Sequence, residues 1–126
     1  MPKPYYPEPE FGWCYYFQKA ELARQFKQWD EVVSLGDAAF GEGLSPADPS
    51  ERFVFIEGYA HAGEWDRAVE LSMQSFDESE LMSPPLCRLW ERVESETAPS
   101  PGRAALGEPK RSEALSEAQT MLTCNP

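Results

Sequence analysis

The chain is poor in the residues that build metal centres and disulfide frameworks. It has one histidine, and its three cysteines, Cys14, Cys87 and Cys124, stand far apart. An odd number of cysteines without a C-x-x-C pair argues against a disulfide framework or a zinc site, so reduced thiols are expected. No metal and no cofactor are predicted.

Long apolar runs are also missing. No stretch approaches about 18 consecutive apolar residues, the length that suggests a membrane span. The opening residues 1–7 contain no apolar segment of the kind that a signal peptide needs. The sequence therefore predicts neither a signal peptide nor direct insertion into a membrane.

Positive charge is scarce. Lys and Arg number 11 against 22 Asp and Glu, which gives a formal net charge of −11. Such a field repels phosphate backbones and anionic lipid, so nucleic acid is a poor partner and a basic or neutral one fits better. The same charge could also serve only to keep a small domain soluble.

Prolines and aromatic residues divide the chain into three parts. Four prolines among residues 1–10 predict an extended lead-in. Residues 97–126 contain no aromatic residue, Val or Ile, and bury too little apolar surface to offset the entropy of ordering. We predict one helical domain over residues 11–96 and a mostly disordered tail, in which 111–122 could form a transient helix.

Between these ends, apolar residues recur at helical spacing. Asp48, Pro49 and Glu51 agree as N-cap, first and third positions of one helix, and Ser83 is expected to cap a later one. The periodicity predicts helices over about 11–26, 29–40, 49–62 and 65–78, and a fifth from about residue 83.

Two stretches, residues 29–35 and residues 65–71, share the pattern Trp-Asp-x-[Val/Ala]-Val-x-Leu at a distance of 36 residues. A repeat near this period is typical of helix–turn–helix solenoid units. The tryptophan that opens each second helix is expected to fill the corner of a hairpin, and Gly63 to form the turn before it.

These units resemble tetratricopeptide repeats. The second unit has a tyrosine, a turn glycine, an aromatic residue and an alanine where that family has its own, and the first unit matches less well. Both lack the W-x-x-L-G opening, and the period exceeds the usual value of about 34. The resemblance implies an all-α solenoid of antiparallel helix hairpins, with about five helices in two and a half repeats. The residues assigned to the repeat are Trp29, Val32, Tyr59, Gly63, Trp65 and Ala68.

A fainter resemblance covers residues 13–25 and 55–60. These segments look like extramembrane C-terminal domains of some bacterial multipass membrane proteins, including glycosyltransferase-like ones. That resemblance implies an accessory domain of a larger membrane-associated protein. A cytoplasmic location is expected if the chain stands alone, and a membrane-tethered soluble domain if it belongs to a longer polypeptide.

The sequence gives little support for a catalytic or metal-binding group of residues. His61, with no second histidine, is better explained as a surface residue than as a metal ligand. The adjacent carboxylates at 30–31 and 77–78 point apart on a helix and suit solvated faces better than acid–base pairs. Cys14 is expected to lie among aromatic residues as a small hydrophobe. Pairing of Cys14 or Cys87 with His61 stays open as an alternative, but we expect a protein that is not an enzyme.

The tetratricopeptide resemblance implies a concave binding face on the first helix of each pair. A non-catalytic interaction module that binds a peptide or protein segment there is the expected function, and the segment could belong to the same larger polypeptide. Ordinary solvent-facing charge is the alternative for each residue. The candidate partner-binding residues are Glu21, Arg24, Gln25, Glu57, His61, Arg88 and Arg92.

Overall fold

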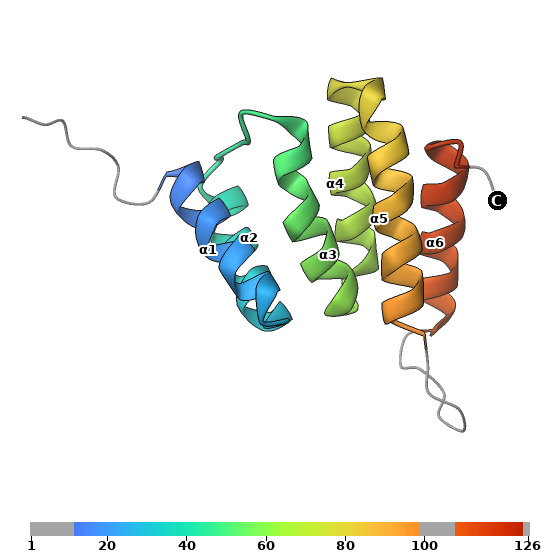
Figure 1. The fold of residues 1–126 in the computed structure, drawn as a ribbon, viewed down its shortest axis with the longest axis horizontal. Coiled ribbons are helices and arrows are strands. Elements are labelled where there is room, and N and C mark those ends of the chain that lie inside the picture. Colours follow the sequence, from blue (N-terminus) through green and yellow to red (C-terminus); the bar gives the residue numbers. More distant parts are fainter. Residues whose placement is uncertain (1–11, 99–107, 125–126) are drawn as a thin grey trace, which may run out of the picture.

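A computed structural model describes residues 12–98 and 108–124. They form six α-helices that pack side by side without any strand (Figure 1), which confirms the predicted all-α helical-repeat class. The lead-in predicted over residues 1–10 lies outside the described residues. Short 3-10 turns, Pro49–Arg52 and Glu80–Met82, precede the third and fifth helices. The helices are α1 (Trp13–Gln25), α2 (Trp29–Gly41), α3 (Phe53–His61), α4 (Trp65–Glu78), α5 (Ser83–Glu96) and α6 (Glu108–Met121).

The first two hairpins turn in the same way. Gly63 has φ +83°, as its predicted turn requires, and Lys27 has φ 54° at the equivalent place 36 residues earlier. The next residue closes each turn, because the N–H of Gln28 donates to the Ala23 carbonyl at 3.0 Å and that of Glu64 to the Tyr59 carbonyl at 2.8 Å. Only glycine adopts a positive φ without cost from a Cβ, so Lys27 is the less favourable of the two.

Helix α3 lies at the centre of the packing and touches α1, α2, α4 and α5. Seven of its nine residues are buried. Its approach to α2 requires Gly58, because a Cβ there would lie only 2.3 Å from Cγ1 of Val32. The start of this segment follows the predicted signals, since the Asp48 carboxylate accepts from the Ser50 N–H, but the first turn is a 3-10 helix.

The C-terminal part departs most from the sequence prediction. Helix α6 packs on α4 and α5 and buries Ala114, Leu115, Ala118 and Leu122. The predicted disorder is therefore wrong for residues 108–124, and the expected five helices become six because α6 completes a third pair. Composition suggested disorder because residues 97–126 contain no aromatic residue, Val or Ile, whereas α6 buries a narrow face of alanine and leucine.

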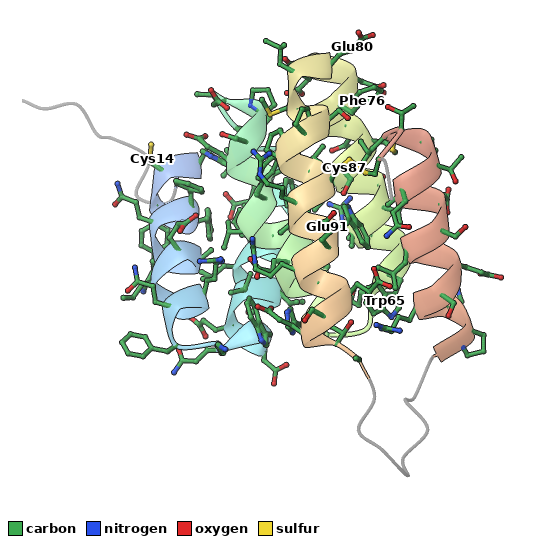
Figure 2. All side chains as sticks on the ribbon, turned by 45° about the vertical axis from the view of Figure 1, so that its right-hand side comes forward. Cys14, Trp65, Phe76, Glu80, Cys87 and Glu91 are labelled. Carbon is green, nitrogen blue, oxygen red and sulfur yellow. A yellow bond between two sulfur atoms is a disulfide. The ribbon has the colours of Figure 1, made fainter. Side chains whose placement is uncertain are left out.

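A disulfide joins Cys87 of α5 to Cys124, just beyond α6, with 5.6 Å between the two Cα atoms. The expected reduced state is thus wrong for these two residues, which lie 37 apart in sequence and meet only because α6 folds back on α5. Figure 2 shows Cys87 between α5 and α6, and Cys14 at the beginning of α1. Cys14 is exposed, so the prediction that it packs among aromatic residues as a small hydrophobe is also wrong: it lies outside the buried face of Tyr16, Ala20 and Ala23.

Ser83 does not act as the predicted helix cap. It is the first residue of α5, and its hydroxyl donates to the Leu122 carbonyl at 2.6 Å, which ties α5 to the end of α6. Among the described helices, none combines the length and apolar character that crossing a bilayer demands.

Candidate functional site

Four of the seven predicted binding residues meet on the face formed by α1, α3 and α5. Glu57 on α3 lies at their centre and is only 2 % exposed. Arg24 of α1 donates to it through Nε at 2.7 Å, and Arg92 of α5 donates through Nε and a terminal nitrogen, both at 3.2 Å. Glu57 is buried and paired, so it is not the ordinary solvent-facing charge that was the alternative for it, and it holds two arginines. Its part in partner binding stays a prediction.

The two arginines keep Glu57 ionised. Burial by itself would raise the pKa of this carboxyl, but hydrogen bonds from Arg92 and Arg24, together with their charges, outweigh burial and lower the pKa. In return, the hydrogen bond with Glu57 raises the pKa of Arg24. The group therefore carries two positive charges and one negative charge at neutral pH, with the arginine side chains 35 % and 42 % exposed.

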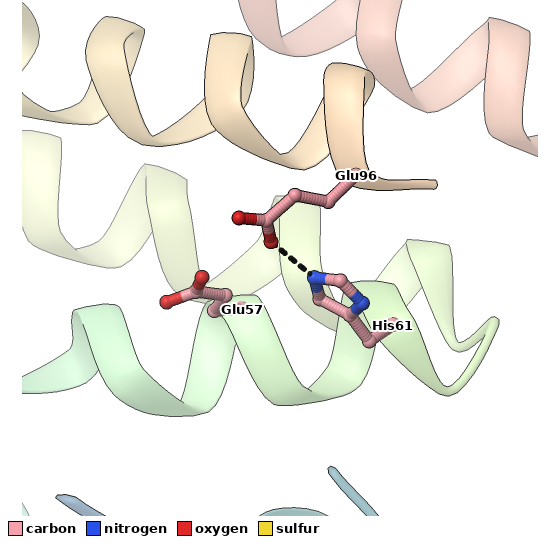
Figure 3. A group of neighbouring side chains, drawn as sticks. All are labelled: Glu57, His61 and Glu96. Atoms are coloured by element: carbon pink, nitrogen blue, oxygen red, sulfur yellow. Dashed lines mark hydrogen bonds and ion pairs between the residues drawn. The ribbon is translucent and has the colours of Figure 1, made fainter. Parts of the chain in front are cut away.

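His61 extends the same face toward the end of α3. Its Nε2 lies 2.9 Å from Oε1 of Glu96 on α5 (Figure 3). On its other side the imidazole stacks on the Trp29 indole, with ring centroids 4.1 Å apart and planes 11° from parallel. The side chain is 11 % exposed, so His61 lies at the surface but is largely covered by Trp29 and α5. His61 links the hairpin corner at Trp29 to α5.

Glu57, His61 and Glu96 also bring three potential metal ligands together, with ligand atoms all within 4.8 Å of one another. Figure 3 shows the Glu57 carboxylate beside the histidine and glutamate pair. The guanidinium groups of Arg24 and Arg92 are already bonded to Glu57, and their charges would repel a cation at this carboxylate. The trio is therefore better suited to ion pairing than to holding a metal.

The remaining predicted residues lie around this group rather than in it. Glu21 is half-buried, and its charge acts on Arg24. Gln25 and Arg88 are exposed, and in the described part of the chain the hydrogen-bond donors to Glu57 are Arg24 and Arg92 alone. Both exposed side chains can still reach a partner that covers this face.

Sequence reasoning missed two members of the site. Glu96 was not singled out, although it follows Arg88 and Arg92 at steps of four on α5 and so lies on the same stripe. Trp29 was assigned only to the repeat, because nothing in the sequence indicates that His61 covers its indole. Cys87 is held in the disulfide, which removes it as a thiol partner for His61.

A shallow groove of about 590 Å³ opens beside the stacked rings of Trp29 and His61. Lys27, Asp30 and Glu31 supply charge along its sides. The site thus offers exposed guanidinium donors, carboxylate acceptors and a groove beside the Trp29–His61 stack. Groups of these kinds can bind a polar segment.

Comparison of the chain with protein-family models, with curated proteins and with solved structures finds no match in any of the three. The fold and the packing of its helices define the class of protein, which is an all-α helical repeat.

Proposed function

We propose that this chain is a protein–protein interaction module of the tetratricopeptide-repeat type, which binds a peptide segment across α1, α3 and α5. The proposal depends above all on one observation. Residues from three successive first helices, Arg24, Glu57 and Arg92, meet in one hydrogen-bonded group on a partly exposed face. A repeat whose only task was to pack its helices would have no need of two half-exposed arginines held around one buried carboxylate.

The chemistry of this face suits a segment of mixed charge. Among the described contacts, Arg24 uses only its Nε–H toward Glu57, which leaves its terminal N–H groups for a partner's carbonyl or carboxylate oxygens. Glu96 and Glu21 can accept from a basic side chain of the same segment. The overall charge of −11 would further speed the approach of a segment with basic flanks.

The test is selection of peptides from a randomised display library on the purified full chain, followed by titration of the selected peptides. Replacement of Arg92 by alanine should weaken their binding by about tenfold or more, which corresponds to about 1.4 kcal/mol. Arg67→Ala is a matched control, because Arg67 is also partly exposed but lies on α4 and pairs with Glu70. Circular dichroism would verify that both variants keep their helices.

Three results would count against this function: no peptide selected above background, equal affinity for Arg92→Ala, or amide chemical-shift changes confined to α2, α4 and α6. Each would show that the face of α1, α3 and α5 is not a binding surface.

A second candidate function is supported by the outer side of α1. Leu22 and Phe26, one turn apart, are 55 % and 67 % exposed. Large apolar side chains that stay in water are expected where another part of a larger polypeptide covers them, as in the accessory domain of a membrane-associated protein. Replacing both with serine should leave the affinity for a selected peptide unchanged if the module acts alone. A loss of binding would place the contact on this side of α1 and favour the accessory role.

A further inference from the structure

Helix α6 contributes the least bulky apolar face of the six described helices. Its buried side chains are those of Ala114, Leu115 and Ala118, with Leu122 in the following turn, and none of them is aromatic. Each of the other five helices contributes at least one aromatic residue to the core or its edge. A helix of this length is marginal in water on its own, so α6 depends on what fastens it to α4 and α5.

The polar contacts described for α6 lie mainly at its two ends, and between them the Gln119 amide donates to the Glu94 carboxylate of α5 at 3.4 Å. At its first turns, Arg111 donates to the Thr97 hydroxyl at 2.9 Å and to the Glu94 carbonyl at 2.8 Å. Lys110 and Asp66 form an exposed pair at 3.4 Å, and exposed pairs of this kind contribute little. At the far end, the Ser83 hydroxyl bonds the Leu122 carbonyl, and the disulfide is close by.

The disulfide is within reach of solvent. Cys87 and Cys124 are only partly buried, and both line a groove of about 440 Å³ between α5 and α6. The other lining side chains are polar, among them Glu91, Glu94 and Gln119. A small dithiol can therefore approach the sulfur atoms without any unfolding of the core.

We propose that the Cys87–Cys124 disulfide is a redox-sensitive lock on α6, and that a dithiol reductant releases this helix from α4 and α5 while α1 to α5 stay folded. A thiolate of the reductant attacks one of the two sulfur atoms, the Cys87–Cys124 bond breaks, and a mixed disulfide forms. The reductant's second thiol then displaces the cysteine and closes a disulfide in the reductant. Two electrons and two protons pass to the protein, which ends with thiols at Cys87 and Cys124.

The consequence is a local rather than a global change. Covalent closure holds the Cα atoms of residues 87 and 124 5.6 Å apart. Without it, α6 relies on a small apolar face and on exposed or part-buried polar contacts such as Arg111 with Thr97 and Ser83 with Leu122. Elements with few buried apolar contacts open separately from the rest of a fold. Release would expose the sides of α4 and α5 that α6 covers.

Hydrogen exchange followed by mass spectrometry tests this on the full chain, with and without dithiothreitol. Reduction should speed amide exchange in residues 108–124 by about tenfold or more while α3 and α4 keep their protection. The double variant Cys87→Ser/Cys124→Ser should exchange like the reduced protein under both conditions. Cys14→Ser is the matched control, because Cys14 takes no part in the disulfide and this variant should respond to dithiothreitol as the parent does.

The lock would be refuted by any of three results. Unchanged protection of α6 after reduction would show that packing alone holds it. Equal loss of protection in α3 and α4 would show that the bond supports the whole domain. An intact mass that gains no hydrogen on reduction would show that the bond does not form.

Discussion

Trp29 and Trp65 occupy the same place in two hairpins, yet their surroundings differ. Both open a second helix, and both follow a turn closed by the same backbone hydrogen bond. Trp65 is 5 % exposed and lies beside Trp90, with ring centroids 6.4 Å apart. Trp29 is only half-buried and is covered by the imidazole of His61. One sequence pattern therefore makes a core contact in the second hairpin and part of the proposed binding face in the first.

A second pair of equivalent positions, Gly36 and Ser72, shows how the two hairpins receive the next helix. A Cβ at Gly36 would lie 2.9 Å from the Tyr59 hydroxyl, so glycine makes room for the tyrosine, which donates to Asp37 at 2.6 Å. At Ser72 the hydroxyl instead accepts the Trp90 indole N–H at 2.9 Å. The two hairpins share the same backbone turn, but the residue at this position differs between them. Glycine leaves room for Tyr59 in the first hairpin, and serine accepts a hydrogen bond from Trp90 in the second.

The largest effect is expected from Trp65→Ala. This change should lower the free energy of unfolding by about 3–5 kcal/mol, because it leaves a cavity beside Trp90 in the core. Urea denaturation followed by circular dichroism would measure it. A decrease of less than about 1 kcal/mol in the free energy of unfolding would mean that the Trp65 indole does not fill the corner of the second hairpin.

Gly58→Ala should be the next most damaging substitution. The new Cβ would press on Val32, and overpacking of this kind costs about 1–3 kcal/mol. Val32→Ala, which copies Ala68 of the second hairpin, should relieve part of the clash in the double variant, because it removes Cγ1 but keeps the Cβ that would lie 2.9 Å from the new methyl group. Thermal unfolding of the two single variants and the double variant would measure the coupling, and strictly additive losses would contradict the close approach of α2 and α3.

Glu57→Gln tests the contribution of the polar face without changing the apolar core. Loss of the charge should cost about 1–2 kcal/mol, a moderate value because Arg24 and Arg92 are exposed enough to be hydrated once they lose their partner. The lowered pKa of Glu57 also has a definite sign for stability. The stability that ionised Glu57 contributes is fully present at pH values above the ordinary pKa of a carboxyl group. It is lost as the pH falls through the lower pKa that Glu57 has in the folded state.

The parent protein should therefore lose more stability than Glu57→Gln between neutral pH and about pH 3. Parallel unfolding curves for the two proteins over this range would measure the difference. Identical pH dependence would show that Glu57 does not titrate as a paired carboxylate.

Trp29→Ala is expected to have the smallest effect on stability, about 1 kcal/mol, because it removes a half-exposed stack on His61 rather than a core side chain. The same variant should weaken peptide binding if the proposed function holds. Comparison with Trp65→Ala in the same buffer is the sharpest test of the contrast between the two hairpins, and equal losses of stability would abolish it.

Helical periodicity predicted the first four helices well, because Ala20, Val32, Ile56 and Leu71 recur on faces that the structure buries. Periodicity could also assign Arg24, Glu57, His61 and Arg92 to the first helix of each pair. It could not show that Glu57 is buried between two arginines, because such pairing depends on the lateral spacing of three helices. The resemblance to tetratricopeptide repeats likewise stays an interpretation of the helical repeat.

The C-terminal residues show the opposite limit. Leu115, Ala118 and Leu122 have helical spacing in the sequence, yet the absence of aromatic residues, Val and Ile from residues 97–126 suggested disorder. What stabilises α6 is contact between residues far apart in the chain, such as Ser83 with Leu122 and Cys87 with Cys124. Contacts of this kind depend on the tertiary fold and leave no local pattern to read.

The disulfide also has a mechanical consequence. Under tension applied between Trp13 and Cys124, the load would pass from α5 directly into Cys124, and the intervening segment, including all of α6, would carry none of it. A separation of 37 residues corresponds to about 130 Å of fully extended chain. The oxidised protein is therefore shorter than its reduced form by this length when stretched, a difference that single-molecule pulling resolves.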